Sequence, residues 1–98
     1  MPKAIIYELA CLISGQLEEA KALDLAKLIE KKISETSSIL NFIEPKKIKL
    51  AYPIKKQQEG FLVSLDFTTE AKNILNFSKE MEKENDILRF LFIKKSPK

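Results

Sequence analysis

In three stretches of this chain the apolar residues line one face at every second position, and this alternation constrains the fold more than any other feature. The stretches span residues 4–13, 60–67 and 87–93. Successive side chains of a β-strand point to opposite faces, so each stretch is predicted to be a strand with one face in the core. A fourth extended stretch, residues 39–54, contains two prolines. Proline offers no N–H to a strand ladder, so this strand is predicted to lie at an edge of the sheet.

Two other segments show the three-and-four spacing of amphipathic helices. The first is predicted over residues 17–36, and the second is predicted to begin at a capping Thr68 or Thr69 and to run to about Glu84. The buried stripe of the first helix is expected to contain Ala22, Leu25, Ala26, Ile29 and Ile33. For the second helix the expected stripe is Ala71, Ile74, Leu75, Ser78 and Met81.

The resulting order is strand, helix, strand, strand, helix, strand. Each half of the chain has a strand and a helix that cannot bury their apolar faces alone. We therefore predict the α+β class: a ferredoxin-like βαββαβ sandwich with a four-stranded antiparallel sheet and both helices on one face. A chain of 98 residues buries only roughly 60 to 65% of its extended surface, so residues 1–98 are expected to form a single domain.

Composition indicates an ordinary globular protein and argues against catalysis. The chain is 45% hydrophobic and 32% charged, and it has no histidine. Its lone cysteine, Cys11, alternates with apolar neighbours and is expected to be a core residue in a reduced, cytoplasmic setting. The apolar stretch at 4–13 falls short of the roughly 18 to 20 residues of a membrane span. We predict no enzyme activity, metal, cofactor or small-molecule substrate, although a small ferredoxin-like phosphatase is conceivable.

Charge is unevenly distributed along the chain. Residues 44–58 carry five lysines and one glutamate, and residues 87–98 carry four basic residues. Residues 66–86 carry six acids against three lysines. A polyanion is expected to prefer the side of the molecule that holds the two basic tracts.

One run within the first basic tract is specific enough to indicate a family. The run Leu-Ala-Tyr-Pro-Ile-Lys-Lys at residues 50–56, with Tyr7-Glu8 in the first strand and Asn-Asp-Ile-Leu-Arg at 85–89, resembles the S6 (S-six) family of bacterial small-subunit ribosomal proteins. The resemblance implies a ferredoxin-like structural component of the cytoplasmic ribosome, active in translation. It would bind small-subunit ribosomal RNA together with ribosomal protein S18 (S-eighteen). One departure is the acidic stretch 81–84, where relatives often carry arginine.

With that resemblance, the basic residues near the run become the expected RNA contacts. They are expected to supply phosphate-binding charge, and a tyrosine within the run a flat face or a hydroxyl. An alternative is that edge-strand lysines only prevent aggregation and that the tyrosine packs at the core rim. The candidate RNA-binding residues are Lys46, Lys47, Lys49, Tyr52, Lys55, Lys56 and, as a secondary candidate, Arg89.

A second surface is predicted where the helices leave one sheet face uncovered. The alternation places there a set of apolar residues large enough to mark a partner site: Ile6, Ala10, Leu12, Leu62, Leu91 and Ile93. All but Ala10 are candidate partner contacts. An RNA-recognition module would show aromatic residues on this face, whereas residues 62, 64 and 66 are leucine, serine and aspartate. The remaining alternative is a ferredoxin-like interaction or regulatory domain that does not bind RNA.

Overall fold

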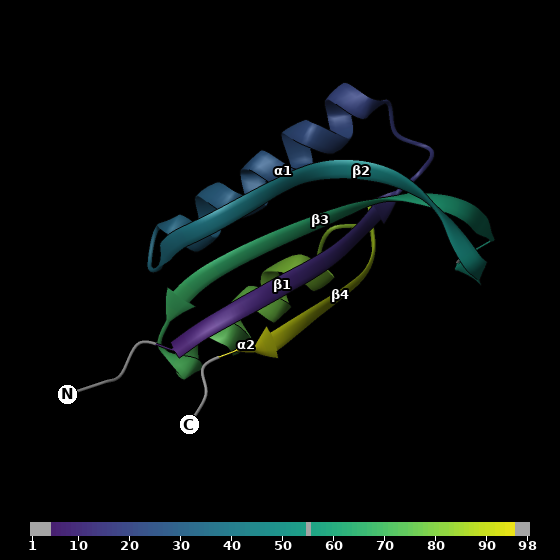
Figure 1. Cartoon of the computed structure of the whole chain (residues 1–98). Helices are drawn as coiled ribbons and strands as arrows, with labels where there is room; N and C mark the ends of the chain where they lie inside the picture. Colours follow the sequence, from purple (N-terminus) through teal and green to yellow (C-terminus); the bar gives the residue numbers. More distant parts are fainter. Residues whose placement is uncertain (1–4, 55, 96–98) are drawn as a thin grey trace.

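The computed structural model describes residues 5–54 and 56–95, and its elements follow the predicted order. Figure 1 shows the sheet with both helices behind it, which confirms the ferredoxin-like sandwich. The elements are β1 (Ile5–Ser14), α1 (Glu19–Ser34), β2 (Ser38–Ile54), β3 (Gln57–Thr69), α2 (Ala71–Glu82) and β4 (Ile87–Lys94).

The four strands lie in the order β2-β3-β1-β4, and every pair is antiparallel. β2 and β4 are therefore the edges, and for β2 this confirms the prediction from its prolines. β1 and β3 pair without interruption from Ile5 opposite Thr69 to Ser14 opposite Gly60. This regular ladder fixes which side chains of the two central strands face the helices.

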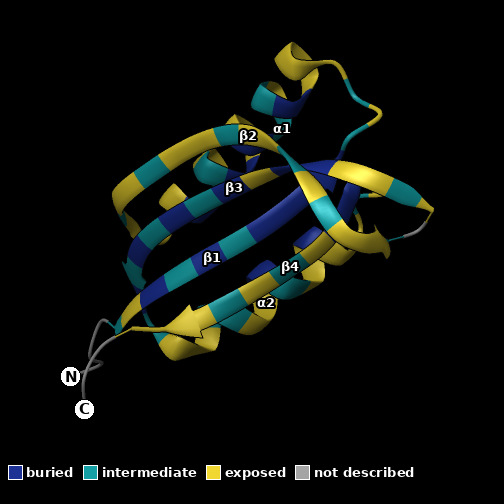
Figure 2. Cartoon of the chain, turned by 45° about the vertical axis from the view of Figure 1, so that its right-hand side comes forward, coloured by how far each residue is buried: buried dark blue, intermediate teal, exposed yellow. Residues whose placement is uncertain are grey.

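The core lies between the sheet and the helices and contains the predicted faces of the central strands (Figure 2). Phe67 is fully buried in this core. Its ring stacks on Tyr7 with the centroids 6.1 Å apart and meets the edges of Phe77 and Phe92 at 5.9 and 6.2 Å. The other buried members of these two faces are Leu9, Cys11, Ile13, Phe61, Val63 and Leu65.

The prediction for the first helix is confirmed and that for the second is partly wrong. In α1, Leu25 is half-buried and the other four expected residues are buried. In α2, Ala71 and Leu75 are exposed, whereas Phe77, which the prediction omitted, is buried. Contact of Phe77 with Phe67 rotates the buried stripe away from Leu75, because an aromatic ring buries more apolar surface than a leucine.

The predicted threonine cap of α2 is also wrong. Thr69 pairs with Ile5 in the sheet, and the N-cap is Glu70, whose side chain makes no capping hydrogen bond. Thr69 instead uses its hydroxyl to accept a hydrogen bond from Asn73 Nδ2 at 2.9 Å. This bond joins the end of β3 to the first turn of α2.

The turn between β1 and α1 lies tightly against the start of β3. A Cβ added to Gly15 would come within 2.4 Å of the backbone oxygen of Glu59, closer than two such atoms can approach. The amide of Ser14 also donates to the carbonyl of Asp86 at 2.7 Å. Three distant parts of the chain therefore meet at this turn, and there is no room for a side chain at residue 15.

We predict that Gly15→Ala lowers the free energy of unfolding by about 1 to 3 kcal/mol, because the backbone of Glu59 must shift. Urea unfolding followed by circular dichroism measures the change. Gln16→Ala is the control, since Gln16 is exposed and such substitutions usually cost under about 0.5 kcal/mol. Equal stability of the two variants would show that the close approach at Gly15 is not a constraint.

Candidate nucleic-acid interface

The segment that carries the family-like run leaves the regular ladder at the end of the β2–β3 hairpin. Lys49 pairs with Glu59 and Ile54 pairs with Gln57. Four residues of β2, numbers 50 to 53, therefore lie opposite one residue of β3, Gln58. Such a bulge bends and twists a strand pair, and in Figure 1 the hairpin end projects beyond the body of the sheet.

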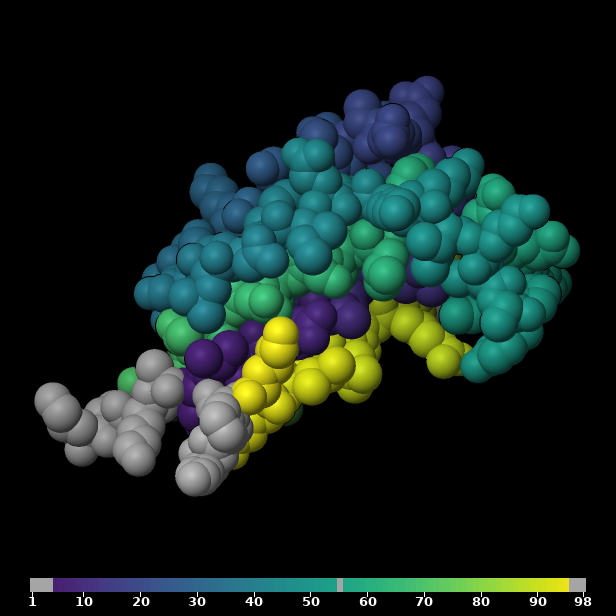
Figure 3. Space-filling view, in the orientation of Figure 1, coloured from purple at the N-terminus to yellow at the C-terminus, as the bar shows by residue number. Residues whose placement is uncertain are grey.

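The bulged segment borders a hollow of about 580 Å³. One wall is formed by Lys49 and by the bulge after it, which contributes Tyr52 and Pro53. Another is the start of β3, and the β1–α1 turn contributes Gly15 and Gln16. Figure 3 shows the hairpin end at one extremity of the molecule. A hollow lined by exposed lysine, glutamine and tyrosine side chains suits a polar ligand of irregular shape.

The structure brings together some of the predicted lysines and separates others. Lys49 and Lys56 line the hollow with Tyr52, whose side chain is 65% exposed. Lys46 and Lys47 are consecutive in a strand and pair with Leu62 and Phe61 respectively, so they point to opposite sheet faces.

Lys47 already has partners within the chain. Its Nζ lies 3.5 Å from Glu59 Oε1 and 5.8 Å from the centre of the Phe61 ring. Lys55 is a predicted contact that lies outside the described residues. Of the predicted RNA contacts, Lys49, Tyr52 and Lys56 are therefore the ones that the structure places around the hollow.

Lys56 holds an unusual backbone conformation, with φ of 67°. For a residue with a Cβ this left-handed region costs roughly 1 to 2 kcal/mol. Glycine or asparagine is the usual choice in tight hairpin turns. A lysine there keeps a charge at the tip at a cost in stability, a pattern that is common at functional sites.

Gln57 fixes the position of the hairpin end and was not predicted as a site residue. Its Oε1 accepts hydrogen bonds from the Ser14 hydroxyl at 3.0 Å and from the Gly15 amide at 2.9 Å. The Ser14 oxygen in turn accepts from the Gln16 amide at 3.2 Å. A glutamine directly after a hairpin turn gives no sequence signal of this role, because its partners lie more than 40 residues away.

The open sheet face, which the helices do not cover, carries side chains in rows that cross all four strands. The first row holds Lys46, Leu62, Leu12 and Arg89. Arg89 and Lys46 are exposed at its two edges. Leu12 is only 8% exposed and lies against Gly60, where an added Cβ would approach its Cδ1 to 2.8 Å. Leu12 therefore offers little surface to a partner.

The second row is mainly apolar, and the third row is acidic. The apolar row contains Ile43, Ser64, Ala10 and Leu91, with Ile43 52% and Leu91 59% exposed. Ile43 was missed, since the bulges in β2 hide which face it occupies. In the acidic row Glu8 lies opposite Asp66, with Ile93 beside Glu8. Lys95 Nζ lies 3.9 Å from Glu8 Oε1 and 3.7 Å from Asp66 Oδ1.

The remaining predicted apolar residues lie outside the apolar row. Leu62 is 37% exposed beside Lys46, and Ile6 and Ile93 are 36% and 41% exposed near the ends of β1 and β4. Leu91 thus offers the largest exposed share among the predicted partner residues.

The thiol and the potential metal ligands of the described residues add no further site. Burial raises the pKa of the Cys11 thiol to about 12, so it is protonated at neutral pH. Within residues 5–54 and 56–95, no group of three or more potential ligand side chains is placed to hold a metal ion. No helix in the same ranges is long and apolar enough to cross a membrane.

Fold and surface together define a ferredoxin-like sandwich with a basic, bulged hairpin end and a partly apolar open sheet face. The family model for ribosomal protein S6 matches residues 6–94. The chain therefore belongs to the ribosomal protein S6 family of the small subunit, as the run at 50–56 predicted. The family consists of structural ribosomal proteins, not enzymes, which confirms that prediction as well.

Individual relatives match over nearly their whole length. The small ribosomal subunit protein bS6c of Phaeodactylum tricornutum is 29% identical over 96 residues, which cover 97% of this chain and 98% of the relative. The protein bS6 of Caldanaerobacter subterraneus subsp. tengcongensis is 33% identical over 93 residues, or 90% and 94% of the two chains. The crystal structure of 30S ribosomal protein S6 from Thermotoga maritima shares the fold, with a TM-score of 0.89 at 24% identity over 95% of this chain and 89% of that one.

We predict that Lys56→Gly leaves the free energy of unfolding unchanged or raises it by up to about 1 kcal/mol, because glycine adopts positive φ without strain. Lys56→Gln is the matched control, since it removes the same charge and keeps the strained backbone. Urea unfolding of both variants measures the difference. A glycine variant less stable than the glutamine variant would contradict the strain at this position.

Proposed function

We propose that this chain binds small-subunit ribosomal RNA together with ribosomal protein S18, as part of ribosomes in the cytoplasm. Family membership supports the ribosomal setting. The observation that carries the RNA assignment is the hollow at the hairpin end, where Lys49 before the bulge, Tyr52 within it and Lys56 at the following turn line one space.

RNA is proposed to contact the hairpin end and the adjacent edge of β2, not the centre of the sheet. No aromatic side chain lies among the described residues of the three rows on the open face. Base stacking of the kind used by RNA-recognition modules therefore has no platform there. Exposed lysines beside Tyr52 favour phosphate contacts with one stacked or hydrogen-bonded nucleotide.

The RNA proposal predicts that RNA binding by a triple variant depends less on salt. Lys46→Gln, Lys49→Gln and Lys56→Gln together should weaken binding to small-subunit ribosomal RNA. Each lost phosphate contact should also make the negative slope of log K against log salt shallower by about 0.7 to 0.9. Filter binding at several salt concentrations provides the measurement.

The matched control replaces three exposed lysines on the helix side, Lys21, Lys31 and Lys79, and so removes the same net charge. Lys47→Gln alone should have less effect than Lys49→Gln, because Lys47 is paired with Glu59. If the slope of log K against log salt became equally shallow in the triple variant and in its control, RNA binding would depend only on net charge.

The S18 protein is proposed to cover the open sheet face around Leu91. Ile43, Leu62, Leu91 and Ile93 are each between 37 and 59% exposed. They lie on β2, β3 and β4, and β1, with Ala10 beside Leu91, fills the place between β3 and β4. Exposed apolar side chains that extend across one sheet face are typical of a protein contact. The buried Leu12 is left out of this proposed contact set.

We expect Leu62→Ser with Leu91→Ser to weaken binding to purified S18 by at least about tenfold, since each loses roughly 1 kcal/mol or more of apolar burial. Titration calorimetry measures the affinity, and circular dichroism confirms the fold. The control pair is Leu28→Ser with Leu75→Ser, two exposed leucines on the helices. Undiminished affinity in the sheet-face variant would move the partner site to an edge strand.

A further inference from the structure

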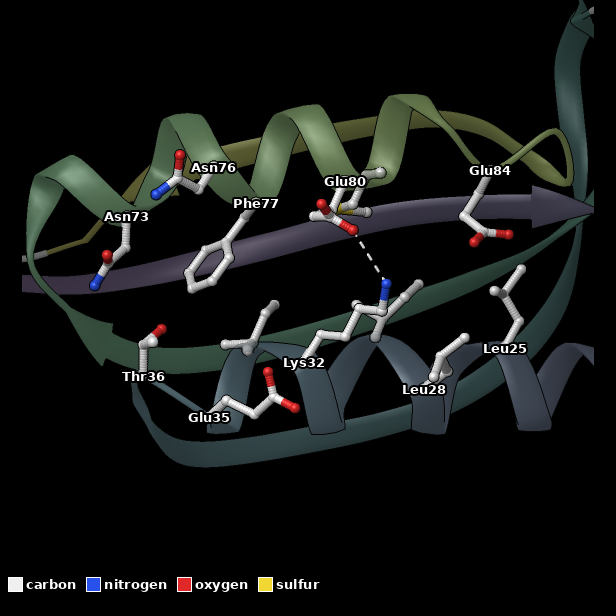
Figure 4. A pocket seen from close by; sticks show the side chains of 13 residues that line it. Leu25, Leu28, Lys32, Glu35, Thr36, Asn73, Asn76, Phe77, Glu80 and Glu84 are labelled. Carbon is white, nitrogen blue, oxygen red and sulfur yellow. Dashed lines mark hydrogen bonds and ion pairs between the residues drawn. The ribbon is translucent and has the colours of Figure 1, made fainter.

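A groove of about 410 Å³ lies between α1 and α2, on the opposite side of the sheet from the surfaces proposed above. Figure 4 shows the helices antiparallel, with Thr36 and Asn73 at one end of the groove and Leu25 and Glu84 at the other. The lining residues span twelve positions of each segment, 25–36 and 73–84, and eleven steps of the helical rise correspond to about 16 Å. This length matches about three helical turns.

The floor of the groove is apolar. Its α1 side contains Leu25, Ile29 and the 43% exposed Leu28, and its α2 side contains Phe77 and Met81. Leu28 lies on the groove side of α1, whereas the exposed Leu75 of α2 is not among the lining residues. The floor therefore presents apolar surface that a partner could cover.

The rim of the groove is acidic. Glu35, Glu80 and Glu84 line it against one lysine, Lys32, which gives the lining a net charge of −2. Lys83, outside the lining, also lies 3.5 Å from Glu80 Oε2, and with it the net charge is −1. Lys32 Nζ donates a hydrogen bond to Glu80 Oε1 at 3.1 Å across the groove, and both side chains are nearly half exposed. Ion pairs with this exposure contribute little to stability, so a competing cation could replace Lys32.

We propose that this groove docks a basic amphipathic helix from a partner protein. Such a helix would place apolar residues at three-and-four spacing on the floor and lysines or arginines against the three glutamates. Charge complementarity selects this occupant: RNA phosphates would be repelled by the carboxylates. A second copy of the chain offers no suitable helix, because α1 and α2 bury their own apolar stripes in the core.

This site goes beyond the proposed ribosomal contacts and can be occupied at the same time. The rows on the open face and the helices that form the groove lie on opposite faces of the sheet. The groove is therefore expected to remain free when the other surface is covered.

The test uses the full chain and a synthetic helical peptide of about three turns, with leucines at three-and-four spacing flanked by lysines. Its control peptide has glutamates in place of the lysines. We expect the basic peptide to bind at least about tenfold more tightly by fluorescence anisotropy. Amide shifts in nuclear magnetic resonance spectra should concentrate on α1 and α2.

Variants of the chain distinguish the groove from general surface attraction. Leu28→Ser should lose most of the affinity, whereas Leu75→Ser, on the exposed side of α2, should not. Glu80→Gln with Glu84→Gln should weaken binding more than Glu82→Gln, which removes a carboxylate outside the lining. Lys32→Ala should strengthen binding of the basic peptide, because the competing cation is removed.

Three results would overturn the proposal. The first is equal binding of the basic and acidic peptides, and the second is an equal loss in Leu28→Ser and Leu75→Ser. The third is a set of amide shifts confined to the open sheet face.

Discussion

The pairing of β1 with both β3 and β4 is the constraint on which the rest of this structure depends. Hydrogen bonds on both sides hold β1 in register over nearly its whole length, so its alternation assigns every second residue to the helix side. Tyr7 and Leu9 then meet Phe67 and Phe92 across the neighbouring strands. A slip of one residue would turn Glu8 into the core and Leu9 outward, which makes any other register far less stable.

That constraint explains why most of the fold could be predicted from the spacing of apolar residues alone. A strand paired on both edges and covered on one face shows its pattern in the sequence, and the prolines of β2 identify an edge. Predictions failed where a single tertiary contact decided the outcome. In α2 the three-and-four spacing fits both a stripe through Leu75 and one through Phe77, and the contact of Phe77 with Phe67 decides which is buried. Thr69 remains in the sheet because it pairs with Ile5, which no local capping signal reveals.

The candidate site was predictable in composition but not in geometry. Lysines and a tyrosine in one short run indicated a polyanion surface. Alternation places Lys46 and Lys47 on opposite faces, but which of the two faces the open side depends on bulges that shift the register of β2 after Ile39, Ile43 and Lys49. The same bulges place Ile43 on the open face. Burial of Leu12 depends on the missing side chain of Gly60, a pairwise fit between strands that alternation cannot show.

The rows on the open face explain how the two proposed ligands could act together. Lys46, at the β2 edge, occupies the same row as Leu62, so a nucleic acid on the hairpin end and a protein on the apolar row would meet at this position. Towards the other end of the strands Glu8 and Asp66 share Lys95, so these three groups carry a net charge of −1, whereas Lys46 and Arg89 make the hairpin side of the face positive. Such a gradient favours one orientation of a charged partner over its reverse. The more basic end of that partner would then lie near Glu8 and Asp66. At the hairpin end, its basic groups would compete with the lysines of this chain for the same RNA phosphates.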